Sequence, residues 1–332
     1  MAIHLMLPIS ILLSSLRYAA DALDGAMVSV TTFTLTNSCG YTVWPGLLSS
    51  AGSPPLPTTG FALAPRESRT VDAPAAWSGR IWGRTLCAAD DQGSGRFACA
   101  TGECGSGTVE CAGGGAAPPT TLAEFTLDGA GGNDFYDVSL VDGSNLPMVV
   151  VPQGGASGPT CGATGCLVDL NGPCPADLRV VGSDGAGIAC KSAYGAYGRT
   201  QDCCSGDYGT PATCQRSASS QFFKKACPRA YSYVYDDATS TFTCTSGTAT
   251  YLITFCPSIS SLKSSVSSSS GSTNPAGLPL VNDTVSFAGR GDGSSYPYAY
   301  ASAPSRSAPC ALALAAAAFT WLCVAPRHRL RL

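Results

Sequence analysis

Histidine and lysine are scarce in this chain of 332 residues. The two histidines, His4 and His328, lie near its opposite ends, and there are only four lysines. A folded middle without histidine excludes Ser-His-Asp triads, Cys-His nucleophiles and zinc sites with histidine ligands. So few lysines also argue against nucleic-acid binding, because that requires clustered cations to neutralise phosphates. If the chain is an enzyme, we expect carboxylates to be its proton-transfer groups.

Charged residues are also few, at 12% of the chain, whereas 38 glycines, 23 prolines and 17 cysteines are present. This composition argues against long helices and coiled coils, which need many charged residues and few turn formers. Seventeen cysteines favour an oxidising compartment and disulfide bonds. No two cysteines have the Cys-x-x-Cys spacing of many zinc ligands. We therefore predict disulfides and expect no metal or cofactor.

Short runs of β-branched and aromatic residues, separated by turn formers, are typical of β-strands. These runs cover residues 28–36, 121–127, 135–141, 231–235 and 250–255. One short helix is predicted over residues 221–226. Many short strands with frequent turns indicate a mainly β fold, either a sandwich or a barrel.

Both ends of the chain differ in composition from the middle. Residues 1–26 resemble a signal peptide, with an apolar run followed by small residues, although its cleavage site is not fixed. Residues 27–257 form the predicted folded domain. Residues 258–309 read as a flexible Ser/Gly/Pro-rich linker, and ten of the sixteen residues at 258–273 are serine. Within this linker, Asn282 begins a glycosylation sequon.

Residues 310–332 are an apolar tail with a basic end, and three interpretations of it stay open. Small residues, a spacer and an apolar tail are typical of a lipid-anchor signal, but the basic ending departs from that pattern. A short membrane-spanning helix is the second interpretation, although 16 uncharged residues fall below the usual length. A featureless alanine-rich tail is the third.

Several motifs of the middle segment occur together with characteristic cysteine spacing. They are GRFACATGEC (residues 95–104), PTTLAEF (119–125), DFYDVSLVDG (134–143), NLPM (145–148), CCSG (203–206), CPRAYSYVYD (227–236) and TFCP (254–257). Over residues 32–257 the chain thus resembles thaumatin-like proteins, the fifth class of plant pathogenesis-related proteins. The resemblance implies a β-sandwich core with disulfide-rich loop subdomains.

The same resemblance implies a disulfide pairing for most of the fifteen cysteines in this stretch. The implied pairs are Cys39–Cys256, Cys87–Cys99, Cys104–Cys111, Cys161–Cys244, Cys166–Cys227, Cys174–Cys190 and Cys204–Cys214. Tyr194 stands where the family has the partner of Cys203. We therefore predict that Cys203 is unpaired within the domain, either as a buried free thiol or bonded outside the domain.

Acidic side chains lie on the polar side of two predicted strands. Glu124 and Asp137 alternate with apolar neighbours, and Asp142 lies in an Asp-Gly turn. The alternation of residues alone is equally compatible with three ordinary carboxylates exposed to solvent. The resemblance instead implies a cleft lined by an arginine, a glutamate and three aspartates. The matching positions are Arg80, Glu124, Asp137, Asp142 and Asp236, with Arg84 as a competitor for the arginine.

A cleft with an acidic excess suits a polar ligand that is uncharged or cationic. The resemblance implies β-1,3-glucan or another cell-wall polysaccharide, and hence a secreted, monomeric plant defence protein with antifungal action in the apoplast. One alternative is a weak endo-β-1,3-glucanase that uses Glu124 and Asp137 as a catalytic carboxylate pair. Another is an extracellular interaction domain tethered to the membrane by the tail. Trp77 and Trp82 are predicted to be core residues, and Lys224 and Lys225 to lie on a solvated helix face.

Overall fold

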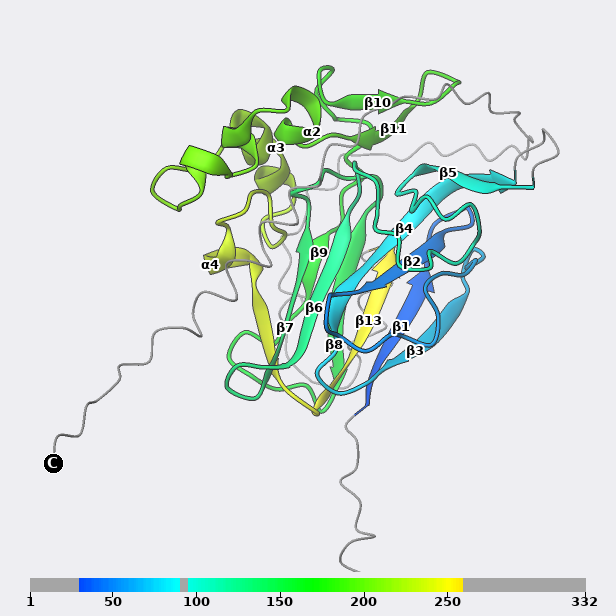
Figure 1. Ribbon diagram of the computed structural model, residues 1–332, viewed down its shortest axis with the longest axis vertical. Coiled ribbons are helices and arrows are strands. Elements are labelled where there is room, and N and C mark those ends of the chain that lie inside the picture. The colour runs from blue at the N-terminus through cyan, green and yellow to red at the C-terminus, as the bar shows by residue number, and fades with distance from the viewer. Residues whose placement is uncertain (1–29, 90–94, 259–332) are drawn as a thin grey trace, which may run out of the picture.

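The computed structural model describes residues 30–89 and 95–258, a mainly β domain with short helices (Figure 1). The predicted signal peptide, most of the linker with Asn282, and the tail lie outside these residues. Within the described part, no helix has the length and apolar character needed to cross a membrane. The elements are β1 (Thr31–Asn37), β2 (Trp44–Ser49), β3 (Ser68–Ala73), β4 (Ser78–Ala89), β5 (Phe97–Thr101), β6 (Leu122–Gly129), β7 (Asn133–Ser139), β8 (Met148–Gly154), β9 (Thr164–Cys166), β10 (Arg179–Val181), β11 (Gly187–Cys190), α2 (Ala193–Tyr197), η1 (Thr200–Asp202), η2 (Gly206–Tyr208), α3 (Ala218–Ala226), α4 (Asp237–Ser240), β12 (Phe242–Thr245) and β13 (Ala249–Phe255).

Two large sheets pack face to face to form the core. One has the order β3-β1-β13-β8-β9, and the other has the order β12-β7-β6-β4-β2, with β5 paired to β4. Strand β1 runs parallel to β13, and the other neighbouring pairs described are antiparallel. The rings of Phe33 in β1 and Phe125 in β6 meet between the sheets, with centroids 4.7 Å apart. The predicted sandwich is therefore the observed architecture.

Most of the predicted elements are present within a few residues of their expected bounds. The runs at 28–36, 121–127, 135–141 and 250–255 correspond to β1, β6, β7 and β13, and the helix at 221–226 lies within α3. Ser217 caps α3 by accepting a hydrogen bond from the Ser220 N–H. Trp77 and Trp82 are fully buried, which confirms their predicted place in the core.

The strand predicted at 231–235 is wrong. Only Tyr231 pairs with the sheet, through a single bridge to Ser139, and the following residues form a turn. The carboxylate of Asp236 accepts hydrogen bonds from the N–H and the hydroxyl of Ser232. These bonds between residues four apart hold the backbone in a turn, so the aromatic run cannot extend as a strand.

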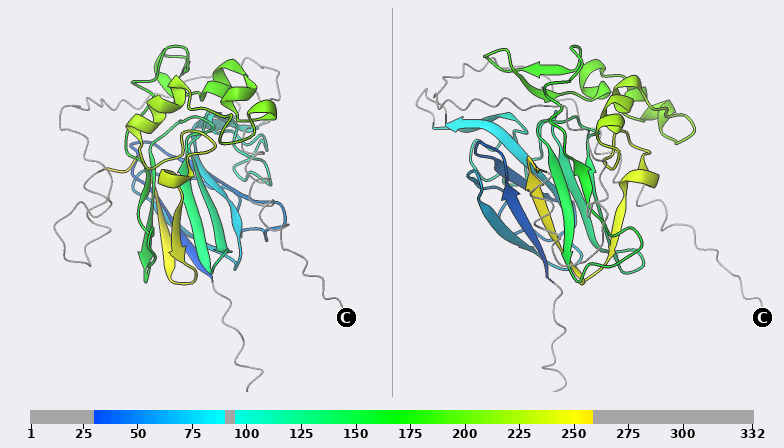
Figure 2. Two further views of the ribbon diagram at one scale, coloured as in Figure 1. Left: turned by 90° about the vertical axis from the view of Figure 1, so that its left-hand side faces the viewer. Right: turned by 180° about the vertical axis from the view of Figure 1, so that it is seen from behind.

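Residues 171–240 form a lobe of short helices and the β10–β11 hairpin, most of which lies at one end of the sandwich (Figures 1 and 2). Two disulfides, Cys174–Cys190 and Cys204–Cys214, lie within this lobe, and Cys166–Cys227 joins it to β9. Seven disulfides are described in total, and they join the same pairs that the family resemblance implies.

The prediction of a free thiol at Cys203 is wrong, because Cys203 is disulfide-bonded. The other fourteen cysteines of residues 27–257 are paired among themselves, so the alternative prediction of a bond outside the domain stays open. Tyr194, which stands in the position of the family's partner cysteine, packs against the cluster that contains Cys203, Cys204 and Cys214.

Candidate functional site

Three of the predicted site residues lie side by side on neighbouring strands. Arg80 in β4 pairs in register with Glu124 in β6, and Glu124 pairs with Asp137 in β7. Their chain neighbours Ile81, Ala123 and Val138 are fully buried in the core. Because successive side chains of a strand point to opposite faces, the three charged residues lie on the outer face of the six-stranded sheet.

Arg80 and Glu124 form an ion pair, with Nη2 of Arg80 3.5 Å from Oε1 of Glu124. Both side chains are partly accessible, at 25% and 19% of their full exposure. Burial raises the pKa of the Glu124 carboxyl, and the positive charge of Arg80 opposes that shift. The pair thus keeps one cation and one anion together at the edge of the solvent, where a ligand could contact both.

Asp137 differs from Glu124 in its partners. Among the described residues, its Oδ1 is a buried oxygen without a hydrogen-bond partner. Burial and the neighbouring charge of Glu124 raise the pKa of Asp137 well above its ordinary value, Arg80 opposes this, and Asp237 adds to it. These influences favour a protonated carboxyl, and its buried Oδ1 lacks a partner among the described residues.

Asp142 lies in the turn that follows β7, where it is 7% exposed. Burial, with the charge of Glu124, raises its pKa to about 6 against the opposing charge of Arg80. The next residue, Gly143, has φ +93°, and an added Cβ would lie 2.5 Å from the carbonyl oxygen of Cys190. Only glycine suits this turn. We name Arg80, Glu124, Asp137 and Asp142 the acidic row.

Asp236, the fifth predicted residue, is not brought into the acidic row. Its side chain has no exposed surface, and its two oxygens lie 2.9 Å from Nη2 of Arg216 and 2.9 Å from Nζ of Lys224. It also accepts the two hydrogen bonds from Ser232 that form the turn. The interpretation of Lys224 as a solvated side chain is therefore wrong, because Asp236 draws it inward, whereas Lys225 is exposed.

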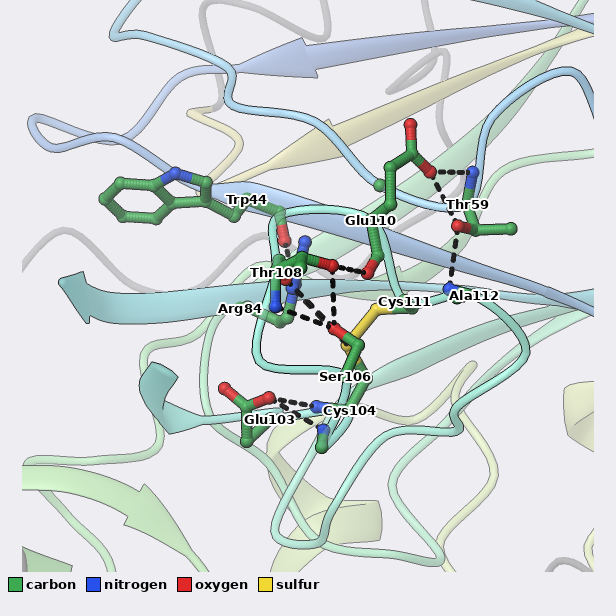
Figure 3. Close-up of a disulfide and its surroundings, with 12 residues drawn as sticks. Trp44, Thr59, Arg84, Glu103, Cys104, Ser106, Thr108, Glu110, Cys111 and Ala112 are labelled. Atoms are coloured by element: carbon green, nitrogen blue, oxygen red, sulfur yellow. Dashed lines mark hydrogen bonds between the residues drawn. A yellow bond between two sulfur atoms is a disulfide. The ribbon is translucent and has the colours of Figure 1, made fainter. Parts of the chain in front are cut away.

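Arg84, the competitor for the arginine position, is a structural residue. Its guanidinium is fully buried beside the Cys104–Cys111 disulfide (Figure 3). It donates hydrogen bonds to the carbonyl oxygens of Trp44, Pro45 and Val109. Burial lowers its pKa, and the charges of Glu103 and Glu110 oppose that shift. These bonds occupy the guanidinium, which leaves Arg80 as the arginine of the site.

Two residues beside Asp137 were missed by the sequence prediction. The phenol of Tyr231 donates a hydrogen bond of 2.6 Å to Oδ1 of Asp237, at the start of α4. Tyr231 bridges Ser139, two residues from Asp137 on the same face of β7, so its side chain lies near Asp137. The signal in the sequence was the adjacent pair Asp236-Asp237, from which the pattern alone cannot select one residue.

Across residues 30–89 and 95–258, no group of three or more metal-ligating side chains is clustered for a metal ion. A small cavity is described in the lobe, lined by residues such as Gln201, Asp202 and Ser232, and it contains none of the five predicted site residues. The site is therefore defined by the acidic row on the sheet.

Comparisons with known proteins extend over the same residues. The chain is 52% identical over 250 residues to "Pathogenesis-related thaumatin-like protein 3.5" of Cryptomeria japonica, which covers 74% of this chain and 100% of that protein. It is 48% identical over 226 residues to "Glucan endo-1,3-beta-glucosidase" of Prunus avium, and the match covers 68% of this chain and 90% of that protein. It is 51% identical over 244 residues to "PR5-like receptor kinase" of Arabidopsis thaliana, covering 73% of this chain but 36% of that protein. The model of the Thaumatin family matches residues 37–257, so the chain belongs to the thaumatin family.

Proposed function

We propose that this domain binds β-1,3-glucan through the acidic row and acts in plant defence. The observation that carries the proposal is the mixture of hydrogen-bonding groups on one sheet face. Arg80 supplies a donor, Glu124 supplies an acceptor, and Asp137 supplies a carboxyl group whose pKa is well above its ordinary value.

This mixture favours an uncharged ligand over a cationic one. The negative charge of Glu124 is balanced by Arg80 at 3.5 Å. Asp142, with a pKa of about 6, and Asp137 are both substantially protonated in a mildly acidic medium. The row then carries little net charge but many donors and acceptors. Sugar hydroxyls can both donate and accept hydrogen bonds, so a neutral polysaccharide matches such a surface.

The named relatives support this ligand class. The Prunus avium relative, 48% identical over 226 residues, is a glucan endo-1,3-beta-glucosidase by name. The Cryptomeria relative is named as pathogenesis-related, which supports a role in defence. An antifungal action would follow if the bound glucan belongs to a fungal wall.

Hydrolysis of the glucan is the second candidate function. Glycosidases typically use two carboxyl groups, one as a proton donor and one as a base or nucleophile. Glu124 and Asp137 are directly opposite each other on β6 and β7, which brings two carboxyl groups to one place on the sheet. Their different partners, Arg80 for Glu124 and an unpartnered oxygen for Asp137, are the specific feature that favours this candidate.

Replacing a carboxylate of the row tests both candidates. We expect Glu124→Gln to weaken binding to laminarin about 10- to 100-fold, since a hydrogen bond to a charged group contributes about 1.5–3 kcal/mol. Asp137→Asn, which replaces a largely neutral carboxyl, should weaken it less, by about 2- to 10-fold, since a neutral hydrogen bond contributes about 0.5–1.5 kcal/mol. Calorimetric titration with laminarin oligosaccharides measures the affinity, and reducing-sugar release measures hydrolysis.

The matched control is Asp72→Asn in β3, an exposed carboxylate on the opposite sheet. It should leave the affinity for laminarin unchanged. Equal affinities of wild type, Glu124→Gln and Asp137→Asn at the same pH would refute the proposed role of the acidic row. If the wild type binds laminarin but releases no reducing sugar, hydrolysis of laminarin is excluded and the proposal of binding stands.

We also propose that the domain is secreted and that residues 310–332 tether it to the extracellular face of the plasma membrane. The support is the sequence pattern of the tail and the 51% identity to a relative named as a receptor kinase, of which this chain covers 36%. Full-length protein should then sediment with membranes, and a chain that ends at Pro257 should be recovered from the medium. Release by a phosphatidylinositol-specific phospholipase identifies a lipid anchor, and retention after that treatment identifies a spanning helix. Soluble full-length protein that keeps its tail would refute the tether.

A further inference from the structure

We propose that three residues beside the acidic row form a second binding row for the polysaccharide. They are Ser78 in β4, Thr126 in β6 and Phe135 in β7, and we name them the neutral row. Its ligand is the next uncharged, β-linked sugar of the chain that the acidic row binds. The inference deepens the proposed function and rests on it.

The register of the strands places the neutral row on the same face as the acidic row. Ser78 pairs with Thr126, and Thr126 pairs with Phe135, so the three side chains lie side by side across the sheet. Each of them lies two positions along its strand from a charged residue of the acidic row, and it therefore points to the same outer face. Two residues of a strand span about 7 Å, so a ligand that runs along the strands passes from one row to the other.

The sheet surface is accessible on this side of the acidic row and closed on the other. All three residues of the neutral row are half-buried or exposed. In the opposite direction along the strands, the next residues on the same face include Trp82 and Leu122, which are 2% exposed or less. Both pack in one cluster with Cys104 and Cys111. A chain that extends from the acidic row along the strands therefore continues over the neutral row.

The two hydroxyls of the neutral row are only weakly bonded. Oγ of Ser78 lies 3.2 Å from Oγ1 of Thr126 and 3.5 Å from Oγ of Ser50, and both distances exceed the usual range of O–H···O bonds. On the outer face of the other large sheet, by contrast, the Thr32 hydroxyl donates to Asp72 at 2.7 Å. A sugar hydroxyl, which both donates and accepts, can replace the weak bonds of the neutral row at little cost.

The ring of Phe135 supplies an apolar platform beside these hydroxyls. A Cβ added to Gly129 would lie 2.9 Å from Cδ2 of Phe135, so the ring lies against the backbone of Gly129 in the neighbouring strand. This contact holds the half-buried ring on the sheet surface. The hydroxyls of β-linked glucose are equatorial, so the faces of the sugar ring carry C–H groups, which suit the negative face of an aromatic ring. A ring beside two uncharged hydroxyls thus matches a neutral sugar.

The test is the affinity of the full chain for laminarin oligosaccharides of increasing length, measured by calorimetric titration. The wild-type affinity should rise once a sugar unit reaches the neutral row. Phe135→Leu keeps an apolar side chain against Gly129 but removes the ring, and we expect it to weaken binding of the longer oligosaccharides about 2- to 10-fold. Thr126→Ala removes one hydroxyl and should weaken their binding by a similar factor, about 2- to 10-fold. Neither variant should change the affinity for the shortest oligosaccharide that the wild type binds.

Two further variants are the controls. Phe135→Tyr keeps the aromatic ring, and Thr70→Ala removes an exposed threonine from β3 in the other large sheet. Both should match the wild type at every length. If Phe135→Leu and Thr126→Ala also match the wild type at every length, the inference is overturned and the proposed function stands. An equal loss for short and long oligosaccharides would overturn it as well, because the substitutions would then act on the acidic row. If the wild type binds no oligosaccharide, the proposed function fails first and the inference fails with it.

Discussion

Asp236→Asn is expected to lower the free energy of unfolding by about 3–5 kcal/mol, which is the usual cost of removing one partner from a buried ion pair. Asp236 is fully buried and lies 2.9 Å from both Arg216 and Lys224. The asparagine would leave both cations without a counter-charge, and Lys224 is only slightly exposed. It would also weaken the bonds to Ser232 that hold the turn.

Unfolding in guanidinium chloride, with the disulfides intact, measures this loss as a lower denaturant concentration at the midpoint of the transition. The natural control is the adjacent Asp237→Asn, because Asp237 is exposed and its replacement should change the free energy of unfolding far less. Similar losses in the two variants would contradict the distinction drawn between a buried structural aspartate and an accessible one.

Asp142→Asn is expected to have the opposite effect and to stabilise the fold at neutral pH. The pKa of Asp142 is raised from 3.8 to about 6 in the folded protein, mainly by burial. A carboxyl with a raised folded pKa binds its proton more tightly in the folded chain than in the unfolded one. Stability is therefore lost as the pH rises from about 4 to 6. A shift of this size corresponds to about 3 kcal/mol as an upper value.

Asparagine is neutral at every pH and removes that loss. The variant should exceed wild type by about 1–3 kcal/mol at pH 7 and equal it below pH 4, as measured by denaturant unfolding across this pH range. A variant that is less stable than wild type at pH 7 would show that the Asp142 carboxylate is needed by the fold. If the gain in stability comes with weaker laminarin binding, Asp142 is retained for function at the expense of stability.

Much of the acidic row could be predicted from the sequence because it depends on local alternation. Glu124 and Asp137 lie on the polar side of strands whose apolar residues are obvious in the sequence, and Asp142 occupies an Asp-Gly turn. The register of β4, β6 and β7 brings these strands' charged residues together. The family resemblance had already assigned Arg80 to the same site. Arg84 could be separated from Arg80 only by the structure, which buries it among the carbonyl oxygens of other loops.

The role of Asp236 could not be predicted, because it depends on contacts between residues distant in the sequence. Arg216 precedes Asp236 by twenty residues and Lys224 lies on a separate helix, yet both meet its carboxylate. Neighbouring aspartates at 236 and 237 look alike in the sequence, and only the fold makes one of them a buried counter-ion. The bonds that Ser232 donates to the same carboxylate explain why the aromatic run at 231–235 turns instead of forming a strand.

The Cys39–Cys256 disulfide has a mechanical consequence for a domain pulled by its two ends. Tension applied at Thr31 and at Pro257 passes from β1 through this bond and bypasses the 217-residue span that it encloses. The hydrogen bonds of β1 to β3 and β13 can break under load, but residues 31–39 span at most about 30 Å in all and already run mostly as an extended strand, so they lengthen very little. Force on the two ends of the domain would therefore leave the acidic row intact until the disulfide is reduced.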